Sequence, residues 1–317
     1  MTAVTARVPA KVNLQLSVGP PGADGYHDLV TVFHALALFD EVTVTSADTD
    51  SVVVTGEGAR SVPLGPDNLA ARAVAALVDA VGPGVRDAPG LAIEIKKRIP
   101  VAAGLAGGSA DAAGALVACN ELWGAGLSHQ ELAEVASRVG SDVGFALLGG
   151  TAVGLGRGDR VTPALAAGTY HWVLAFADGQ LSTPAVYAAC DRLRAGRAGP
   201  ADPPGPPQLD TALMAALRSG EPAELGPLLS NDLQPAAVSL LPRLRQALAA
   251  GREHGALGAI VSGSGPTCAF LARDGAHARD LAVALAGAGV CRTVATVTGP
   301  APGASVVSVP TGGCARA

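Results

Sequence analysis

Hydrophobic residues alternate with polar residues, or run together, over two long segments near the start of the chain. Residues 3–18 and 28–55 are rich in valine and predict strands. Gly19-Pro20-Pro21-Gly22 predicts the turn between them. The apolar stretch from Leu91 to Ile95 predicts a further strand, which leads into a glycine-rich segment. The first hundred residues are therefore expected to contain several strands.

Helices in this half are marked by their capping residues. Asp67 is the expected N-cap of a helix that runs to about Val81 and stops at Gly82. Ser128 and Glu131 have the spacing of a capping box. The remaining expected elements are a helix over 129–139 closed by Gly140, strands near 151–155, 173–176, 259–261, 267–271 and 290–298, and helices near 208–219, 235–254 and 277–288.

Two segments have little apolar surface to bury. Residues 196–207 are mostly proline and glycine and predict a loop. Residues 299–317 predict a flexible tail. Strands and helices occur on both sides of the proline-rich loop, and no internal repeat is visible. The pattern predicts an α+β fold in two parts.

Composition narrows the function classes. The chain has 317 residues, 49% of them hydrophobic and 15% charged, with a net charge of −5. This length suits one large or two ordinary domains, and the acidic balance argues against binding to nucleic acid or to an anionic membrane. No uncharged apolar run approaches the ~18 residues of a membrane helix. The N-terminus lacks the apolar core of a signal peptide, and five widely spaced cysteines favour a cytoplasmic setting.

The most informative segment is residues 100–113, in which three glycines precede an alanine-rich helix. Glycine allows positive φ and close approach of a ligand to the backbone. A helix N-terminus adds free N–H groups and a favourable dipole, so the segment predicts an anion site, typically for phosphate. The spacing matches neither a P-loop nor a dinucleotide fingerprint. Close packing of a helix on a sheet is the alternative that the residues alone leave open.

This segment resembles the ATP loop of the GHMP kinases. That loop has the form P-x-x-x-G-L followed by small residues, serine and alanine, and the matching residues are Pro100, Gly104, Leu105, Gly108, Ser109 and Ala110. Other motifs agree in order and begin at Pro9, Asp24, Asp67, Lys97, Gly140, Ser182, Asn231 and Ser262. The resemblance covers about residues 6–296. It implies a ribosomal-S5-like N-terminal domain over 1–165 and a ferredoxin-like C-terminal domain over 166–298, with the active site between them.

Catalysis by such a kinase requires a group that accepts the proton of the attacking hydroxyl. Asp142 lies at a helix boundary, where a purely structural role as a helix cap is the simplest interpretation. Lys11 and Asn13 share one face of a strand whose other face is apolar. On an edge strand these two side chains would simply face solvent. The resemblance instead implies that Asp142 is the base, that Lys11 pairs with it, and that Asn13 binds substrate.

Two of the three tyrosines, Tyr26 and Tyr187, fall in motifs of the family, and His27 and Thr183 stand near them. Tyrosines near turns usually pack against their neighbours. The resemblance implies instead that the two rings hold a pyrimidine between them, with His27 at its polar edge and Thr183 nearby. The partner implied is a small-molecule substrate that carries a cytidine diphosphate group.

The same resemblance implies ATP as the phosphoryl donor. The residues it assigns to ATP are Asp67, Asn68, Lys97, Pro100, Gly104, Leu105, Ala106, Gly107, Gly108, Ser109 and Ala110. Several have plainer interpretations: Asp67, Asn68 and Ser109 as helix caps, and Lys97 as a solvated charge. No cluster has the spacing of a metal cage. Mg²⁺ is therefore expected to arrive with ATP, with Ser109 as a contact.

The function implied is the phosphorylation by ATP of the 2-hydroxyl of a methylerythritol linked to cytidine diphosphate, a step in isoprenoid precursor synthesis. One alternative is a homoserine- or mevalonate-type kinase. Another is a non-catalytic ligand sensor on the same fold. Retention of Lys11, Ser109 and Asp142 together argues against the sensor. Whether the chain acts alone or as a homodimer is open.

Overall fold

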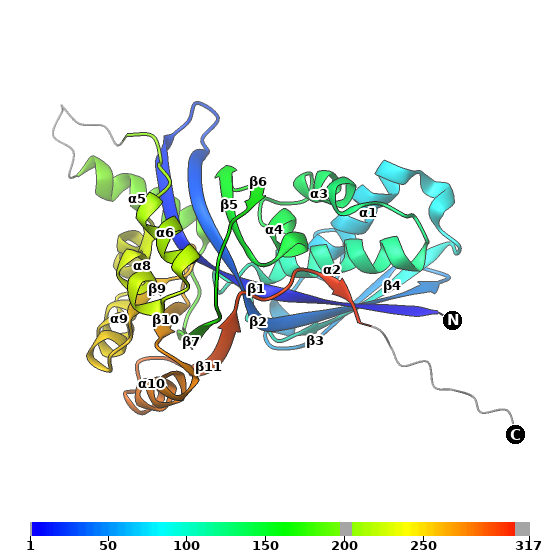
Figure 1. The fold of residues 1–317 in the computed structure, drawn as a ribbon. Helices are drawn as coiled ribbons and strands as arrows, with labels where there is room; N and C mark the ends of the chain where they lie inside the picture. Colours follow the sequence, from blue (N-terminus) through cyan, green and yellow to red (C-terminus); the bar gives the residue numbers. More distant parts are fainter. Residues whose placement is uncertain (1, 197–204, 308–317) are drawn as a thin grey trace, which may run out of the picture.

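The computed structural model describes residues 2–196 and 205–307, which form an eight-stranded sheet and a four-stranded sheet (Figure 1). The first sheet contains β1 (Ala3–Pro21), β2 (His27–Ala47), β3 (Ser51–Gly56), β4 (Gly90–Lys97), β5 (Thr151–Gly156), β6 (Arg160–Pro163), β8 (Ser230–Asn231) and β12 (Ser305–Val306). The second contains β7 (Tyr170–Phe176), β9 (Gly258–Val261), β10 (Cys268–Ala272) and β11 (Thr293–Gly299).

Helices cover both sheets. They are α1 (Leu69–Val81), α2 (Gly107–Leu122), α3 (His129–Ser137), α4 (Val143–Leu148), α5 (Thr183–Ala195), α6 (Thr211–Ser219), α7 (Pro222–Leu225), α8 (Gln234–Leu240), α9 (Arg243–Glu253) and α10 (Gly275–Gly287). Short 3-10 turns occupy Ala59–Ser61, Pro83–Val85 and Gly226–Leu228. In Figure 1, α1 to α4 lie beside the first sheet and α5, α8, α9 and α10 beside the second. The predicted α+β class is confirmed.

The first sheet has the order β12-β1-β2-β4-β3, with β5 and β6 attached to β2 and β8 parallel to β1. Its longest strands, β1 and β2, form an antiparallel pair in which Lys11 lies opposite Ala35 and Asn13 opposite Phe33. The second sheet has the order β11-β7-β10-β9 and is antiparallel throughout. The strands expected in both halves are therefore present, and β1 carries its polar Lys11–Asn13 segment into the middle of the molecule.

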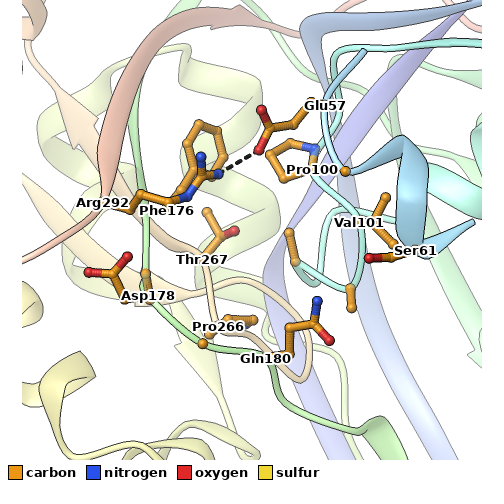
Figure 2. A pocket seen from close by; sticks show the side chains of 15 residues that line it. Glu57, Ser61, Pro100, Val101, Phe176, Asp178, Gln180, Pro266, Thr267 and Arg292 are labelled. Carbon is orange, nitrogen blue, oxygen red and sulfur yellow. Dashed lines mark hydrogen bonds and ion pairs between the residues drawn. The ribbon is translucent and has the colours of Figure 1, made fainter. Parts of the chain in front are cut away.

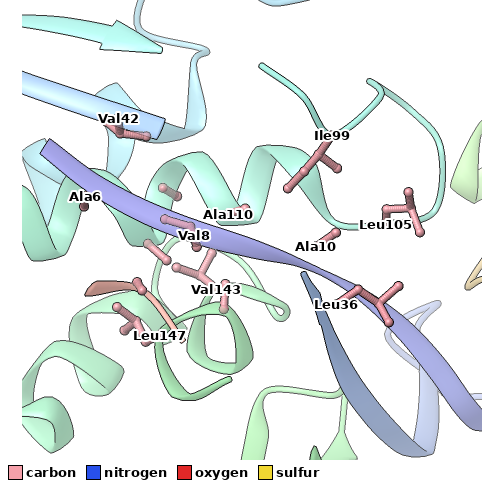
Figure 3. Packing of buried hydrophobic residues seen from close by; sticks show 14 of the residues in the cluster. Ala6, Val8, Ala10, Leu36, Val42, Ile99, Leu105, Ala110, Val143 and Leu147 are labelled. Atoms are coloured by element: carbon pink, nitrogen blue, oxygen red, sulfur yellow. The ribbon is translucent and has the colours of Figure 1, made fainter. Parts of the chain in front are cut away.

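Small residues hold α2 against the first sheet. The helix is buried on most sides, including Ala110 and Gly114. A Cβ on Gly114 would lie 2.8 Å from a methyl of Val42 and 2.9 Å from one of Val8, and Figure 3 shows these valines against the helix. A bulkier helix would be pushed away from the strands. The alanine-rich sequence therefore fixes where the N-terminus of α2, at Gly107, meets the sheet.

Three local predictions need correction. The N-cap of α1 is Asn68 rather than Asp67, since the Asn68 side chain accepts a 2.8 Å bond from the N–H of Ala70. The first turn begins at Gly22, because β1 pairs with β2 as far as Pro21. The single helix expected over 235–254 is two helices, α8 and α9, which Pro242 separates by removing a backbone donor. The capping box of Ser128 and Glu131 is confirmed.

The flexible tail expected over 299–317 is wrong for its described part. The chain beyond β11 returns to the first sheet, where Ala301 and Ala304 are buried and β12 pairs with β1. The N–H of Val307 donates to the carbonyl of Thr5 at 2.7 Å. The small residues of this segment allow its main chain to approach the first sheet closely. The same composition that predicts disorder therefore permits tight packing here. Residues 308–317, and most of the loop expected over 196–207, lie outside the described residues.

The division into 1–165 and 166–298 remains a proposal. Each part has its own sheet, but β8 from the second part and β12 from the residues after it join the first sheet. In the described residues no helix is both long enough and apolar enough to cross a membrane.

Candidate active site

Three cavities are lined in part by the segment that leads from the end of β4 into α2. We call them the Lys11 cavity, of about 190 Å³, the Asn68 cavity, of about 270 Å³, and the Arg292 cavity, of about 320 Å³. The Lys11 cavity is lined by Lys11, Asn13, Leu16, Leu29, Thr31, Phe33, Gly104, Ala106, Ser141, Asp142, Arg157, Gly158, Thr183, Tyr187, Leu233, Gly263 and Ser264. It thus collects residues from both parts of the chain.

Lys11 is held on one wall of this cavity by β1. Its side chain is only 6% exposed, and its ammonium donates a 2.7 Å hydrogen bond to Asn13 Oδ1. Asn13 is held in turn by a 2.8 Å bond from its Nδ2 to Thr31 Oγ1. The Lys11 N–H donates to the carbonyl of Leu105 at 3.2 Å, which ties β1 to the glycine-rich loop. Burial lowers the pKa of Lys11, and the charge of Asp142 partly opposes that effect.

Asp142 stands opposite, immediately before α4. Its Oδ2 lies 3.7 Å from Lys11 Nζ, and its side chain is 27% exposed. Although it occupies the N-cap position, its side chain makes no capping hydrogen bond. The carboxylate is therefore available to the cavity, with Lys11 as its cationic neighbour.

The glycine-rich loop approaches the same cavity from α2. Gly104 and Ala106 have positive φ, +77° and +59°, and both line the cavity. A side chain on Gly104 would collide with the carbonyl oxygen of Ser262 and lie 3.0 Å from the backbone of Gly265. Beyond the turn, α2 begins at Gly107, so its first N–H groups have no partner within the helix. This is the geometry of an anion site.

The Asn68 cavity is lined by Asp67, Asn68, Lys97 and Gly108, among others. Other residues predicted to bind ATP lie elsewhere. Pro100 lines the Arg292 cavity, while Leu105 and Ala110 are buried in the core, where their side chains pack and do not face a cavity.

Lys97 differs most from its expected role. Its ammonium is buried and makes ion pairs with Asp40 Oδ2, at 2.5 Å, and Asp111 Oδ2, at 2.6 Å. The second oxygen of Asp40 accepts the N–H groups of Arg98 and Ile99, at 2.6 and 2.9 Å. A lysine committed to two carboxylates is not free to meet a phosphate directly. Its charge instead holds the end of β4 to the first turn of α2 and so positions the loop.

Asp111, on α2, completes this cluster. Burial raises its pKa to about 8; Lys97 opposes the rise and Asp40 adds to it. Its Oδ1 is buried and has no hydrogen-bond partner among the described residues. Nothing in the local sequence indicates this environment, since Asp40 and Lys97 come from other strands.

The aromatic residues are arranged differently from the expected sandwich. Tyr187 lines the Lys11 cavity, but its ring neighbour is His27, with centroids 5.0 Å apart. His27 Nε2 lies 3.0 Å from Asp191 Oδ1, which follows Tyr187 by one turn of α5. Tyr26 is 58% exposed, does not line the cavity, and carries the guanidinium of Arg157 3.8 Å above its ring. His27 thus takes the place beside Tyr187 that we expected for the substrate ring or Tyr26.

Sequence reasoning missed Arg157, whereas Ser264 belongs to the family motif that begins at Ser262. Thr183 Oγ1 lies 2.9 Å from Ser264 Oγ, which joins the first turn of α5 to the loop after β9. The glycines at 156 and 158 could have indicated a tight turn that presents Arg157, because both adopt positive φ.

The Arg292 cavity is the largest of these three, but it is lined by neither Lys11 and Asp142 nor the N-terminus of α2. Figure 2 shows Arg292 and Glu57 on its wall, joined by an ion pair of 2.6 Å between Nη2 and Oε1. Thr267 lies deeper, and its N–H donates to the carbonyl of Ala103 at 3.3 Å. These contacts fasten the second sheet to the back of the glycine-rich loop.

A resident metal site is not indicated. Within residues 2–196 and 205–307, no three His, Cys, Asp or Glu side chains gather closely enough to hold an ion. Ser109 is partly exposed at the start of α2 but lines none of the three cavities.

Comparison with known proteins shows the family of this chain. Residues 68–150 match the family model for the GHMP kinases N terminal domain, and residues 213–291 match that for the GHMP kinases C terminal. The chain is 56% identical over 309 residues to a 4-diphosphocytidyl-2-C-methyl-D-erythritol kinase of Mycolicibacterium smegmatis, covering 97% of this chain and 93% of the relative. A kinase of the same name from Thermobifida fusca is 53% identical over 315 residues, covering 96% and 99%.

Solved structures give the same result. A crystal structure of 4-(cytidine 5'-diphospho)-2C-methyl-D-erythritol kinase superposes with a TM-score of 0.73 at 35% identity and covers 93% of this chain and 99% of its own. A homoserine kinase from Cytophaga hutchinsonii, at 20% identity and a TM-score of 0.70 over 97% and 98%, shares the fold.

Proposed function

The chain belongs to the GHMP kinase family, and from that premise we propose that it transfers the γ-phosphoryl group of ATP to the 2-hydroxyl of 4-diphosphocytidyl-2-C-methyl-D-erythritol. It is an ATP-dependent phosphotransferase with an alcohol acceptor, and its product belongs to isoprenoid precursor synthesis. The observation that carries the proposal is the Lys11–Asp142 pair, 3.7 Å apart, on the wall of a cavity that the glycine-rich loop also lines.

Asp142 and Lys11 have different roles at the hydroxyl that accepts the phosphoryl group. Asp142 accepts the proton of the substrate hydroxyl as that oxygen attacks phosphorus. Lys11 places its ammonium beside the same oxygen and the moving phosphoryl group, where negative charge develops. Burial of Lys11 strengthens this interaction, because there is little water to screen it. Asn13 fixes the lysine by accepting its 2.7 Å hydrogen bond.

The donor lies along the glycine-rich loop. The N–H groups at the start of α2 bind the phosphates, and the loop between Gly104 and Gly108 leads from the Asn68 cavity to the Lys11 cavity. The adenosine part occupies the Asn68 cavity. Ser109 would be the protein contact of a Mg²⁺ ion carried by the triphosphate, and that ion would neutralise charge on the phosphates. Lys97 keeps the loop in place through Asp40 and Asp111.

The acceptor binds with its pyrimidine near Tyr187 and its hydroxyl end near Asp142. Thr183 and Ser264 lie at the cavity wall between the two parts of the chain. His27 contributes by supporting the face of Tyr187. This arrangement supports a cytidine-linked substrate over homoserine or mevalonate, because neither of those has a ring to stack on the tyrosine.

A direct assay tests the proposal. The purified chain is incubated with ATP, Mg²⁺ and, separately, the cytidyl substrate, homoserine and mevalonate, and products are identified by mass spectrometry. Mass gain of one phosphoryl group on the cytidyl substrate alone supports it. Faster phosphorylation of either other alcohol would favour another kinase of the family, and phosphorylation of none would favour a ligand sensor.

A further inference from the structure

We infer that Arg157 binds the diphosphate of the cytidyl substrate and makes the enzyme prefer a nucleoside diphosphate over a bare nucleoside. The inference rests on the proposed function and concerns a residue for which the family resemblance implied no role. Arg157 occupies the tight turn between β5 and β6 and lines the Lys11 cavity.

The charges of the cavity point to this role. Among the residues that line it, the charged ones are Lys11, Asp142 and Arg157. The first two form an ion pair with each other at the site of phosphoryl transfer. A diphosphate brings at least two further negative charges into a protein whose net charge is −5. Arg157 is the remaining cation on the wall that can oppose them.

The guanidinium is already oriented. It lies 3.8 Å above the ring of Tyr26, and its Nη2 donates a 2.8 Å hydrogen bond to Asp24 Oδ2. The ring and the carboxylate together fix the guanidinium plane while using few of its five donors. The donors left over can bind two phosphate oxygens in parallel, a geometry that lysine cannot provide.

The turn beneath Arg157 is also constrained. Gly156 and Gly158 have φ of +71° and +87°, and the N–H of Arg157 donates to Asp159 Oδ1 at 3.0 Å. The side chain is 53% exposed, so a ligand can reach it. A fixed backbone with an accessible head group reduces the entropy lost when a phosphate binds.

The position suits the middle of the substrate. Tyr187 and Asp142 line the same cavity as Arg157 and are proposed to bind the two ends of the molecule, the pyrimidine and the reactive hydroxyl. The diphosphate links those ends. Arg157 is therefore a binding residue for the part of the substrate that the ring and the base do not contact.

The test is calorimetric binding of CDP and of cytidine to the whole chain and to Arg157→Ala, Arg157→Lys and Arg160→Ala. Arg160 is exposed on β6, three residues away, and does not line the cavity. We expect Arg157→Ala to weaken CDP by about 10- to 100-fold, the range for lost hydrogen bonds to a charged group. Cytidine binding should not change, the lysine variant should be intermediate, and Arg160→Ala should match the wild type.

Kinetics supply a second readout. In Arg157→Ala the KM for the cytidyl substrate should rise by a similar factor, with kcat and the KM for ATP nearly unchanged, because the interaction is made in the ground state as well as in the transition state.

Three outcomes would overturn the inference. If Arg157→Ala binds CDP as the wild type does, the residue does not bind the diphosphate. If CDP and cytidine weaken equally, Arg157 acts only by supporting Tyr26. If the wild-type chain binds neither ligand, the inference fails together with the proposed function, a result distinguishable from the other two.

Discussion

Replacement of Asp111 by Asn is expected to remove a pH dependence from the stability of this protein. Asp111 is buried, and the same cluster holds a second carboxylate, Asp40, against a single lysine, Lys97. Burial raises the pKa of Asp111 from its ordinary 3.8 to about 8. The folded protein therefore keeps a proton on this carboxyl that the unfolded chain has released above about pH 4.

The direction of the effect follows from that difference. The folded state binds more protons than the unfolded state between the two pKa values, so the free energy of unfolding falls as the pH rises. The stabilisation is complete below pH 3.8 and is lost as the pH passes through about 8. Each pH unit in this window corresponds to about 1.4 kcal/mol, so two units correspond to at most roughly 3 kcal/mol.

Thermal denaturation followed by circular dichroism at several pH values measures this loss of stability. For a chain of this size, roughly 3 kcal/mol corresponds to a loss of about 4–6 °C in Tm between about pH 6 and pH 8. Asp111→Asn cannot titrate but keeps an oxygen for Lys97, so its Tm should lack that loss. Asp79→Asn, an exposed change on α1, is the control and should follow the wild type. Parallel Tm curves for wild type and Asp111→Asn would refute the reasoning.

The remaining predictions concern turnover and binding. Asp142→Asn should lower kcat by roughly 10²- to 10⁴-fold with Tm unchanged, since its side chain caps no helix; turnover within a few-fold of wild type would exclude it as the base. Lys11→Ala should depress kcat more than it weakens substrate binding, measured by steady-state kinetics; the reverse pattern would make it a binding residue. Tyr187→Ala should weaken the cytidyl substrate by about 1–3 kcal/mol, and Tyr26→Ala by less, because Tyr26 does not line the cavity; equal losses in competitive binding would contradict the structure. Gly104→Ala should raise the KM for ATP, because its Cβ would meet the backbone of the loop after β9; unchanged ATP affinity in a folded variant would make the loop purely structural.

Local patterns in the sequence determined much of the fold. Alternation placed Lys11 and Asn13 on one face of β1, and the structure brings both to one cavity. The capping box at Ser128 begins α3 as predicted. The glycine-rich segment before α2 indicated an anion site, because backbone conformation and helix dipole depend on residues next to one another. Signals of this kind act over a few residues, so a sequence displays them directly.

Other features depended on contacts between distant segments. The α5 helix was not predicted because charged residues interrupt its apolar period, yet it supplies both Tyr187 and Asp191 to the site. The final strand β12 lies in a segment whose composition is typical of flexible tails, and it is a strand because it pairs with β1.

The cluster of Lys97, Asp40 and Asp111 shows most clearly which features a sequence does not display. Lys97 looks in sequence like a cation for phosphate, but Asp40 arrives from β2 and Asp111 from α2, and both accept hydrogen bonds from its ammonium in the interior. The charge state of a buried group is set by every neighbour within a few ångströms and by the exclusion of water. Sequence alone therefore determined which chemical groups this protein possesses, and the tertiary structure decided which of them face the substrates and which hold the loop in place.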